Sequence, residues 1–436
     1  MTSIPPTRLE NWLKSRLGQE RLSQELLETF QLDLLNETLL HARKNSPFYR
    51  QRLKDGPDLP LTDLSRIAEL PFTTAEDLRQ HHLQMLCVSL GDVARVVTMQ
   101  TSGTSSSPKR LYFNESDLER TMDFFHQGLT SFVDPGQEIL ILFPSTKPDS
   151  LGDQLKRGAS RIPATAHIHW PVLDLESILG EIRDRQIDCL AGAPAQIFAL
   201  CRHEQYGRRL KPNPLKSVLL STDYIPQAVA DEIRNVWGCS VFEHYGMTEM
   251  GLGAALECDA HQGYHLREAD LLVEVIDPVT GRPLPPGIDG EVVFTTLARQ
   301  AMPLIRYRTG DRAAWMNPPC DCGTFLRRLG KVRGRLADLS STRSPFSMPQ
   351  LDEAILALPG IYSFQAALRK EGGADVLDLN VFCQGRRSGP LKEEIPAALT
   401  PLLTKPGHDA FSVSITTHPL EALRWDSTGM IKRTIG

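Results

Sequence analysis

The sequence lacks any long apolar run: no stretch of about 18 consecutive apolar residues, the length that a membrane-spanning helix needs, occurs in it. No transmembrane segment is therefore expected. The opening residues, MTSIPPTRLENWLKSRLGQE, also lack an apolar signal core, which argues against secretion and predicts a cytoplasmic protein. A strong excess of one charge sign is also absent: 48 basic and 53 acidic residues give a formal net charge of −5, so the chain as a whole has no attraction for nucleic acid or for an anionic membrane.

The chain is also poor in cysteine and in repeated sequence. Its 8 cysteines in 436 residues are too few for a disulfide scaffold, so close-spaced cysteines are expected to be metal ligands or free thiols. No internal repeat or low-complexity tract is visible. What remains is ordinary globular composition, 41% hydrophobic and 23% charged, in a chain long enough for two or three domains.

The pattern of apolar residues predicts an α/β fold. Residues 8–55 have apolar side chains at helical spacing, with a break at Asn45, Ser46 and Pro47. From about residue 95, short apolar runs alternate with helical stretches, which favours a parallel sheet covered by helices. The expected strands are 139–143, 189–191 and 218–220, and the expected helices are 177–185 and 228–236.

The character of the sequence changes near residue 271. Two apolar runs, 271–276 and 291–295, follow one another, and the turn residues DPVTG come directly after the first. This order indicates antiparallel strands after the α/β region. The residues from 340 onward read as a small separate module, with an expected helix near 348–357 and expected strands at 377–382 and 411–416.

The strongest local signal is the loop TSGTSSSPK at residues 101–109. Small hydroxyl residues around a glycine let backbone N–H groups approach a phosphate, and the lysine adds a cation. Composition alone leaves a flexible serine-rich surface loop as the alternative. The loop is not a Walker motif, because the GxxxxGK[ST] spacing is absent. The candidate phosphate-binding residues are Thr101, Ser102, Gly103, Thr104, Ser105 and Lys109.

This loop resembles the phosphate loop of the adenylate-forming superfamily, usually written TSGTTGxPK, with Ser106 in place of the second glycine. Three further segments match that superfamily in the same order: EHYGMTE at 243–249, RYRTGD at 306–311 and Gly334-Arg335. Each motif alone is a weak signal, whereas four motifs in order are hard to attribute to chance.

The match narrows to one subgroup. NSPFYR at 45–50 and AMPLIRY at 301–307 are similar to segments of phenylacetate–coenzyme A ligases and coenzyme F390 synthetases, and the resemblance covers essentially the whole chain. It implies a large N-terminal α/β adenylate-forming domain with helix-covered sheets, residues 1–335. It also implies a small mobile α+β C-terminal domain, residues 336–436.

The resemblance implies a role for each matching residue. Tyr245 would flank the adenine, and Thr248 would contact the α-phosphate. Glu249 would hold Mg²⁺, a hard cation that prefers carboxylate oxygens. Asp311 would accept hydrogen bonds from the ribose hydroxyls. Beyond the phosphate loop, the implied nucleotide-binding residues are Tyr245, Gly246, Asp311 and Arg335, the last by reaching ribose or phosphate.

A metal site is expected as well. Cys320 and Cys322 form a C-x-C pair in a turn-like stretch, and Cys258, His261 and His265 lie about 60 residues upstream. Four such ligands suit tetrahedral Zn²⁺ in a closed, structural site. We expect Cys258, His265, Cys320 and Cys322 to be the ligands, with His265 preferred over His261 because it stands in the family-like GYH triplet. The alternative is four unrelated residues.

The tail departs from the superfamily pattern. A catalytic lysine usually stands in a C-terminal G-K-x-x-R, but here Gly429 and Arg433 frame Met430 at the lysine position. A thioether supplies no positive charge to the reacting oxygens. Three interpretations stay open: Lys432 substitutes after a local shift, the protein binds nucleotide but adenylates slowly, or the reaction differs.

The resemblance implies a reaction. ATP would activate a carboxylic acid, aryl or arylacetic, as its acyl-adenylate, and coenzyme A would then take the acyl group, with Thr248, Glu249 and Lys432 as the catalytic residues. The alternatives are a degenerate nucleotide-binding protein and an adenylyltransferase resembling coenzyme F390 synthetase. Partners would be the acid, ATP and coenzyme A, with no nucleic acid or membrane, and a homodimer is suggested by analogy. Acid-pocket candidates are Trp170, Ala193-Pro194 and Tyr245-Gly246.

Overall fold

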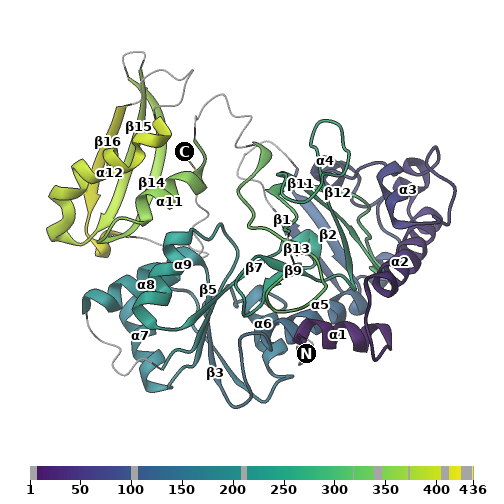
Figure 1. Cartoon of the computed structure of the whole chain (residues 1–436), viewed down its shortest axis with the longest axis horizontal. Helices are drawn as coiled ribbons and strands as arrows, with labels where there is room; N and C mark the ends of the chain where they lie inside the picture. The colour runs from purple at the N-terminus through teal and green to yellow at the C-terminus, as the bar shows by residue number, and fades with distance from the viewer. Residues whose placement is uncertain are drawn as a thin grey trace. The chain divides into compact units, whose positions relative to one another are not determined.

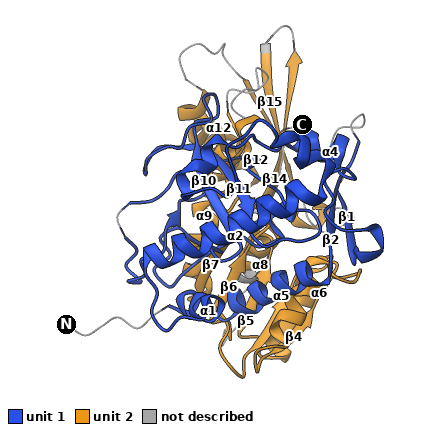
Figure 2. Cartoon of the chain, turned by 90° about the vertical axis from the view of Figure 1, so that its right-hand side faces the viewer, with its two compact units in different colours: residues 1–131, 244–332 blue, residues 132–243, 333–436 orange. Residues whose placement is uncertain are grey.

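The chain divides into two compact units in the computed structural model, each made of two stretches of sequence (Figure 2). Unit 1 combines residues 1–131 with 244–332, and unit 2 combines residues 132–243 with 333–436. No helix of the described part is both long and apolar enough to cross a bilayer. The described residues are 7–99, 107–207, 214–317, 319–337, 346–371, 374–403, 412–423 and 435.

Unit 1 begins with three helices whose ends follow from their capping residues (Figure 1). The Thr7 side chain caps the first helix, and Gly18 ends it in the left-handed conformation at φ 65°. Ser46 ends the second helix and caps the third, where Pro47 occupies the first turn. The expectation of helix through residues 8–55 is confirmed. The helices are α1 (Arg8–Leu17), α2 (Gln24–Asn45) and α3 (Pro47–Arg52).

Antiparallel strands form most of the remainder of unit 1. The predicted pair, 271–276 with 291–295, is confirmed, and its register runs from Leu271 opposite Thr296 to Ile276 opposite Glu291. A two-stranded hairpin flanks residues 100–106. The elements are η1 (Leu64–Glu69), α4 (Ala75–His81), η2 (Leu90–Asp92), β1 (Arg95–Met99), β2 (Lys109–Phe113), α5 (Glu115–Leu129), β10 (Leu271–Ile276), β11 (Gly290–Thr296) and β12 (Tyr307–Ala313).

Unit 2 contains the predicted parallel sheet, with the hydrogen-bonded order β7-β6-β5-β3-β4. Every residue of β5 and β6 is buried, as expected for strands covered on both faces. Helices alternate with these strands along the chain. The elements are β3 (Glu138–Ile141), α6 (Leu151–Ala159), β4 (Thr165–Ile168), α7 (Leu175–Asp184), β5 (Cys189–Gly192), α8 (Pro194–Gly207), β6 (Ser217–Leu220), α9 (Gln227–Trp237) and β7 (Ser240–Tyr245).

The last two residues of β7, His244 and Tyr245, belong to unit 1 and pair antiparallel with β8, which pairs with β9 and through it with β13. The turn after β7 is a single 3₁₀ turn that carries two predicted site residues, Thr248 and Glu249. These elements are η3 (Thr248–Met250), β8 (Ala255–Glu257), β9 (Tyr264–Leu266) and β13 (Arg328–Leu329).

The C-terminal part of unit 2 is a three-stranded sheet of order β14-β15-β16 with two helices. The predicted helix and both predicted strands are confirmed, and β14 is a further strand that pairs antiparallel with β15. That residues 336–436 move as a domain stays a prediction. The elements are α11 (Met348–Leu356), β14 (Ile361–Glu371), β15 (Ala374–Cys383), η4 (Gly385–Arg387), α12 (Ser388–Leu403), β16 (Ser412–His418) and η5 (Leu420–Ala422).

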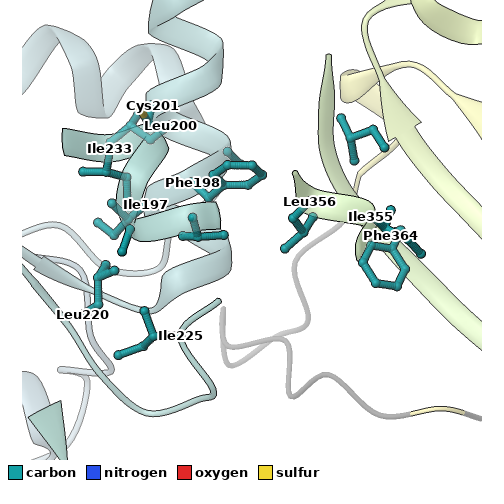
Figure 3. Close-up of a cluster of buried hydrophobic side chains, with 14 of the residues drawn as sticks. Ile197, Phe198, Leu200, Cys201, Leu220, Ile225, Ile233, Ile355, Leu356 and Phe364 are labelled. Carbon is teal, nitrogen blue, oxygen red and sulfur yellow. The ribbon is translucent and has the colours of Figure 1, made fainter. Parts of the chain in front are cut away.

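This C-terminal part shares one apolar core with α8 and α9, in which Phe198 of α8 and Leu356 of α11 take part (Figure 3). Two polar side chains join the same elements. Arg202 of α8 is 3% exposed and donates hydrogen bonds to the carbonyls of Leu356, Leu358 and Ile361 at 2.6–3.3 Å. The carbonyl of Leu356 is one that the end of α11 leaves without a partner inside the helix, and the other two belong to the segment that leads from α11 into β14.

The second polar contact caps α9. Its N-cap residue, Pro226, makes no side-chain cap. The Glu353 carboxylate of α11 accepts instead from the backbone N–H of Gln227, at 2.8 and 3.0 Å, and from Tyr224 Oη at 2.7 Å. An acid at this end also suits the helix dipole. Helix α9 is therefore completed by a residue more than a hundred positions later in the chain.

Candidate active site

Lys109 and Glu249, predicted from separate motifs, form an ion pair in unit 1. Lys109 is the last residue of the predicted phosphate loop and the first residue of β2, and Glu249 lies in the 3₁₀ turn after β7. The Glu249 side chain is only 2% exposed, and Tyr307 Oη donates to its Oε1 at 3.2 Å. Both of these contacts use Oε1 of the carboxylate. The loop residues Thr101 to Ser105 lie outside the described part of the chain.

A second contact joins the next two predicted residues. Tyr245 Oη donates to Asp311 Oδ2 at 3.0 Å. The Asp311 backbone N–H donates to Thr309 Oγ1, whose hydroxyl donates to the Val292 carbonyl at 2.7 Å. The Asp311 carboxylate is therefore fixed on β12, as a ribose-binding acid needs to be.

Strand β12 links the two contacts. Tyr307, Thr309, Asp311 and Ala313 are the buried residues of β12, and the residues between them are less buried. Tyr307 meets Glu249 and Asp311 meets Tyr245 from two buried positions of β12. The pairing of β12 with β11 is irregular between Arg308 and Arg312, so these two positions are separated by a β-bulge. This arrangement can hold a phosphate and metal at one end and a sugar at the other.

The two arginines of RYRTGD, Arg306 and Arg308, form ion pairs with residues outside the predicted site. Arg306, 1% exposed, makes a two-point ion pair with Glu274, and its guanidinium lies 4.1 Å from the Phe72 ring centre. Arg308 pairs with Glu291, which also accepts from the Gly310 N–H at 3.1 Å. These pairs shape the strand that presents Tyr307 and Asp311.

The remaining predicted residues are placed as follows. Gly246 has no room for a side chain, because a Cβ there would lie 2.1 Å from the Leu252 carbonyl oxygen. Thr248 opens the 3₁₀ turn. Arg335 belongs to unit 2 and is exposed, and its role stays a prediction. Met430 and Lys432 lie outside the described residues.

The four predicted zinc ligands also come together in unit 1. The ligand atoms of Cys258, His265, Cys320 and Cys322 all lie within 4.8 Å of one another. The Sγ atoms of Cys258 and Cys320 are 3.5 Å apart, and Cys322 Sγ is 3.5 Å from His265 Nε2. A tetrahedral site with Zn–S bonds of about 2.3 Å has edges of about 3.8 Å, so the donor set fits the metal.

The geometry also separates the two histidines. His265 lies on β9 opposite Arg328 of β13, and burial lowers its pKa to about 4, so the imidazole is neutral and has a lone pair for a metal. His261 contacts Glu257 instead, at 3.3 Å, and is not in the cluster. A cavity of about 530 Å³ opens beside the cluster, lined partly by Cys258 and Cys322.

Known proteins resemble this chain along most of its length. The model of the AMP-binding enzyme family matches residues 155–298. A phenylacetate–coenzyme A ligase of Pseudomonas putida is 30% identical over 378 residues, which are 83% of each chain. The chain belongs to the phenylacetate–coenzyme A ligase family. A second such ligase, from Thermus thermophilus, is 29% identical over 435 residues, 96% of this chain and 92% of the relative.

Solved structures share the fold of this family member. A 2-hydroxyisobutyryl-CoA ligase in complex with 2-HIB-AMP gives a TM-score of 0.79 at 20% identity, covering 97% of this chain and 92% of that one. A benzoate CoA ligase from Burkholderia xenovorans gives 0.52 at 15% identity, covering 74% and 65%. The predicted α/β fold is confirmed. The chain is thus an AMP-forming acid–coenzyme A ligase, a class that activates acids with ATP.

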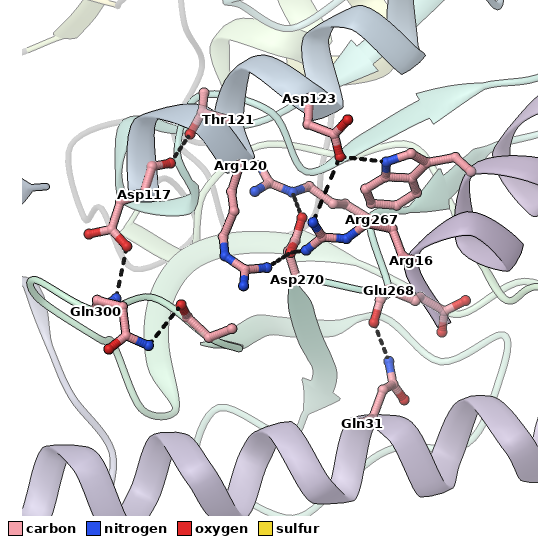
Figure 4. Close-up of polar contacts among 12 residues, drawn as sticks. Arg16, Gln31, Asp117, Arg120, Thr121, Asp123, Arg267, Glu268, Asp270 and Gln300 are labelled. Carbon is pink, nitrogen blue, oxygen red and sulfur yellow. Dashed lines mark hydrogen bonds and ion pairs between the residues drawn. The ribbon is translucent and has the colours of Figure 1, made fainter. Parts of the chain in front are cut away.

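A buried charge network supports the Glu249 turn in this ligase (Figure 4). Asp270 accepts from Arg16 at 2.7 Å, from Arg267 at 2.8 Å and from Arg120 at 3.2 Å. Burial opposes ionisation of Asp270, but the guanidiniums outweigh it and lower the pKa of the carboxyl group. Arg267 in turn reaches the Gly253 carbonyl, just after the turn.

Sequence reasoning missed two residues that contact Glu249. Tyr307 stands inside the RYRTGD motif, so its position was a usable signal. Arg299 donates to the Glu249 carbonyl at 2.8 Å from a segment that no motif marks.

Proposed function

We propose that the chain uses Mg·ATP to convert an aryl or arylacetic acid into its acyl-adenylate and then transfers the acyl group to coenzyme A. The observation that carries this proposal is the pairing of Lys109 with Glu249 and of Tyr245 with Asp311 around the buried residues of β12. The family relationship supports the reaction class. The aryl character of the acid is inferred from the relatives, which are phenylacetate–coenzyme A ligases.

In the first half-reaction, a carboxylate oxygen of the acid attacks the α-phosphorus, and the bond to the leaving pyrophosphate breaks. Glu249 would hold Mg²⁺, which neutralises phosphate charge when bound. One buried carboxylate plus substrate phosphates is how Mg²⁺ is usually bound. Lys109 would exchange its bond to Glu249 for the phosphates, Thr248 would contact the α-phosphate, and Asp311 would hold the ribose.

In the second half-reaction, the coenzyme A thiol attacks the acyl carbon, its proton is lost, and AMP leaves. We propose that residues 336–436 rotate as a domain between the two steps and bring Arg335 and the tail to the nucleotide. Such a rotation would have to break the contacts that Arg202 and Glu353 make between α11 and helices α8 and α9. Lys432 would supply the cation that Met430 does not. A homodimer is proposed only by analogy with the family.

We also propose a structural zinc ion bound by Cys258, His265, Cys320 and Cys322. The spacing of the donor atoms supports a tetrahedral site. Such a metal would join the loop after β8 to the loop before β13 and so brace the segments that follow the two nucleotide-binding motifs.

The decisive experiment is ATP–pyrophosphate exchange with a panel of carboxylic acids, using the full chain. Exchange that requires an added aryl or arylacetic acid is the expected result, and Glu249→Gln should remove it. No exchange with any acid, at protein and Mg·ATP concentrations that show binding by calorimetry, would refute adenylation.

A second candidate function is nucleotide binding without efficient turnover, which Met430 favours. It predicts calorimetric binding of ATP or AMP and no exchange. An adenylyltransferase of the coenzyme F390 synthetase type would instead show exchange that depends on a hydroxyl compound and not on an acid.

A further inference from the structure

Arg299 lies behind the turn that carries Glu249. Its side chain is 8% exposed, and its Nη1 donates to the Glu249 carbonyl at 2.8 Å. The guanidinium also lies 5.1 Å from the Phe113 ring centre. Burial lowers the pKa of Arg299 to about 10, so the group is still charged at neutral pH. A charged donor makes a stronger hydrogen bond than a neutral one.

The backbone on either side of Arg299 is held in place. Ala298 has a left-handed φ of 59°, which costs free energy for a residue with a side chain. Its N–H donates to Thr38 Oγ1 at 3.1 Å. The N–H of Gln300 donates to the Asp117 carboxylate at 2.8 Å (Figure 4). The N–H of Ala301 donates to the same carboxylate at 3.0 Å. Helices α2 and α5 therefore hold the strained segment 298–301, in which Arg299 is the one charged residue.

The turn itself fits closely around this guanidinium. Gly251, the residue that ends the turn, has φ 78°. A Cβ there would lie 3.0 Å from Thr121 Oγ1 and 3.4 Å from Arg299 Nη2. Arg299 holds the carbonyl of Glu249 by a hydrogen bond and lies close to Gly251, which ends the turn. Arg299 therefore fixes the orientation of the peptide group that follows Glu249.

We infer that Arg299 is a positioning residue for magnesium binding: it aims the Glu249 carboxylate at the metal of Mg·ATP without touching metal or substrate. This inference rests on the proposed function, which makes Glu249 the metal-holding carboxylate. Arg299 holds the backbone carbonyl of Glu249, whereas Tyr307 holds its carboxylate, so the two contacts together fix the direction of this side chain.

The test compares Arg299→Met and Arg299→Lys with Arg202→Met in the full chain. Arg202 is a matched control: it is also a buried arginine that donates to backbone carbonyls and lies over a phenyl ring, here Phe198 at 4.5 Å. Two readouts are used as Mg²⁺ is titrated at fixed ATP, the rise in melting temperature and the rate of acid-dependent pyrophosphate exchange.

We expect Arg299→Met to raise the Mg²⁺ concentration for half of the thermal stabilisation roughly tenfold or more, the effect of losing one hydrogen bond from a charged donor. Arg299→Lys should restore part of it, whereas Arg202→Met should lower the melting temperature without changing the Mg²⁺ dependence. If Arg299→Met does not fold, the lysine variant still decides the question. Equal Mg²⁺ dependence in the Arg299 and Arg202 variants overturns the inference. Absence of exchange in the wild type refutes the proposed reaction alone, because the thermal readout still tests Arg299.

Discussion

Asp270 is the charge at which three guanidiniums meet, and its replacement by asparagine should be strongly destabilising. The pair with Arg267 is fully buried, with side chains 3% and 5% exposed, whereas Arg16 and Arg120 are 24% and 31% exposed. Breaking a buried pair costs about 3–5 kcal/mol, and partly exposed pairs add about 0–1 kcal/mol each. We therefore expect Asp270→Asn to lose about 4 kcal/mol of unfolding free energy.

Thermal and urea unfolding provide the assay. A change of 1 kcal/mol shifts the melting temperature of a domain of 150–250 residues by about 2–4 °C, so the expected fall is roughly 10 °C. Asp123→Asn is the matched control, because Asp123 is 31% exposed and contacts only Trp12 at 2.8 Å and Arg16 at 3.9 Å among its described partners. That control should lose less than about 1 kcal/mol.

The stabilisation from Asp270 should depend on pH in a defined direction. The folded-state pKa of Asp270 lies below its ordinary value of 3.8, so its stabilisation is present above that pH and is lost as pH falls through the lower folded value. The difference between wild type and Asp270→Asn should therefore be equal at pH 7 and pH 5. A difference under about 1 kcal/mol at pH 7, or one that disappears between pH 7 and pH 5, would refute the reasoning.

Three further predictions concern the site. Glu249→Gln should slow acid-dependent pyrophosphate exchange roughly 10²–10³-fold, and full activity would contradict its role as the metal carboxylate. Cys322→Ser should lower the zinc content measured by elemental mass spectrometry well below that of the wild type, and an unchanged content would exclude Cys322 as a ligand. Met430→Lys should raise the exchange rate roughly 10²-fold if the site is intact but lacks its cation. If this variant shows no gain, Lys432 already supplies the cation, and Lys432→Ala should then lower the exchange rate.

The sequence was most informative where apolar side chains decide the structure. The run at 271–276 is buried along its whole length and was predicted as a strand, as were β5 and β6. Strand β12 was not predicted, because two of its buried residues, Thr309 and Asp311, are polar, and the sequence therefore shows no apolar alternation. Helix α12 contains Pro396 and Pro401, which predict turns, yet Leu391, Ile395 and Leu399 are buried on it, and their packing favours the helix.

The site was predictable only in part, for a related reason. The order of the motifs identified Lys109 and Glu249 as site residues. Their ion pair joins positions 140 residues apart in the chain, so it depends on the tertiary structure. The contact from Arg299 depends on a left-handed residue and on hydrogen bonds from two helices, none of which a single sequence reveals. The choice of His265 over His261 was made from a local triplet, and the strand pairing of β9 with β13 supplies its physical reason.

The capping of α9 by Glu353 bears on how such ligases can be recombined. A chimera that takes its last hundred residues from a relative would import a foreign α11 while keeping Gln227 and Tyr224 of this chain. Unless the donor also places an acid at the position of Glu353, the first turn of α9 would be left with open N–H groups. Relatives that can donate a C-terminal part can therefore be selected by checking for an acidic residue at the position of Glu353, before their substrates are considered.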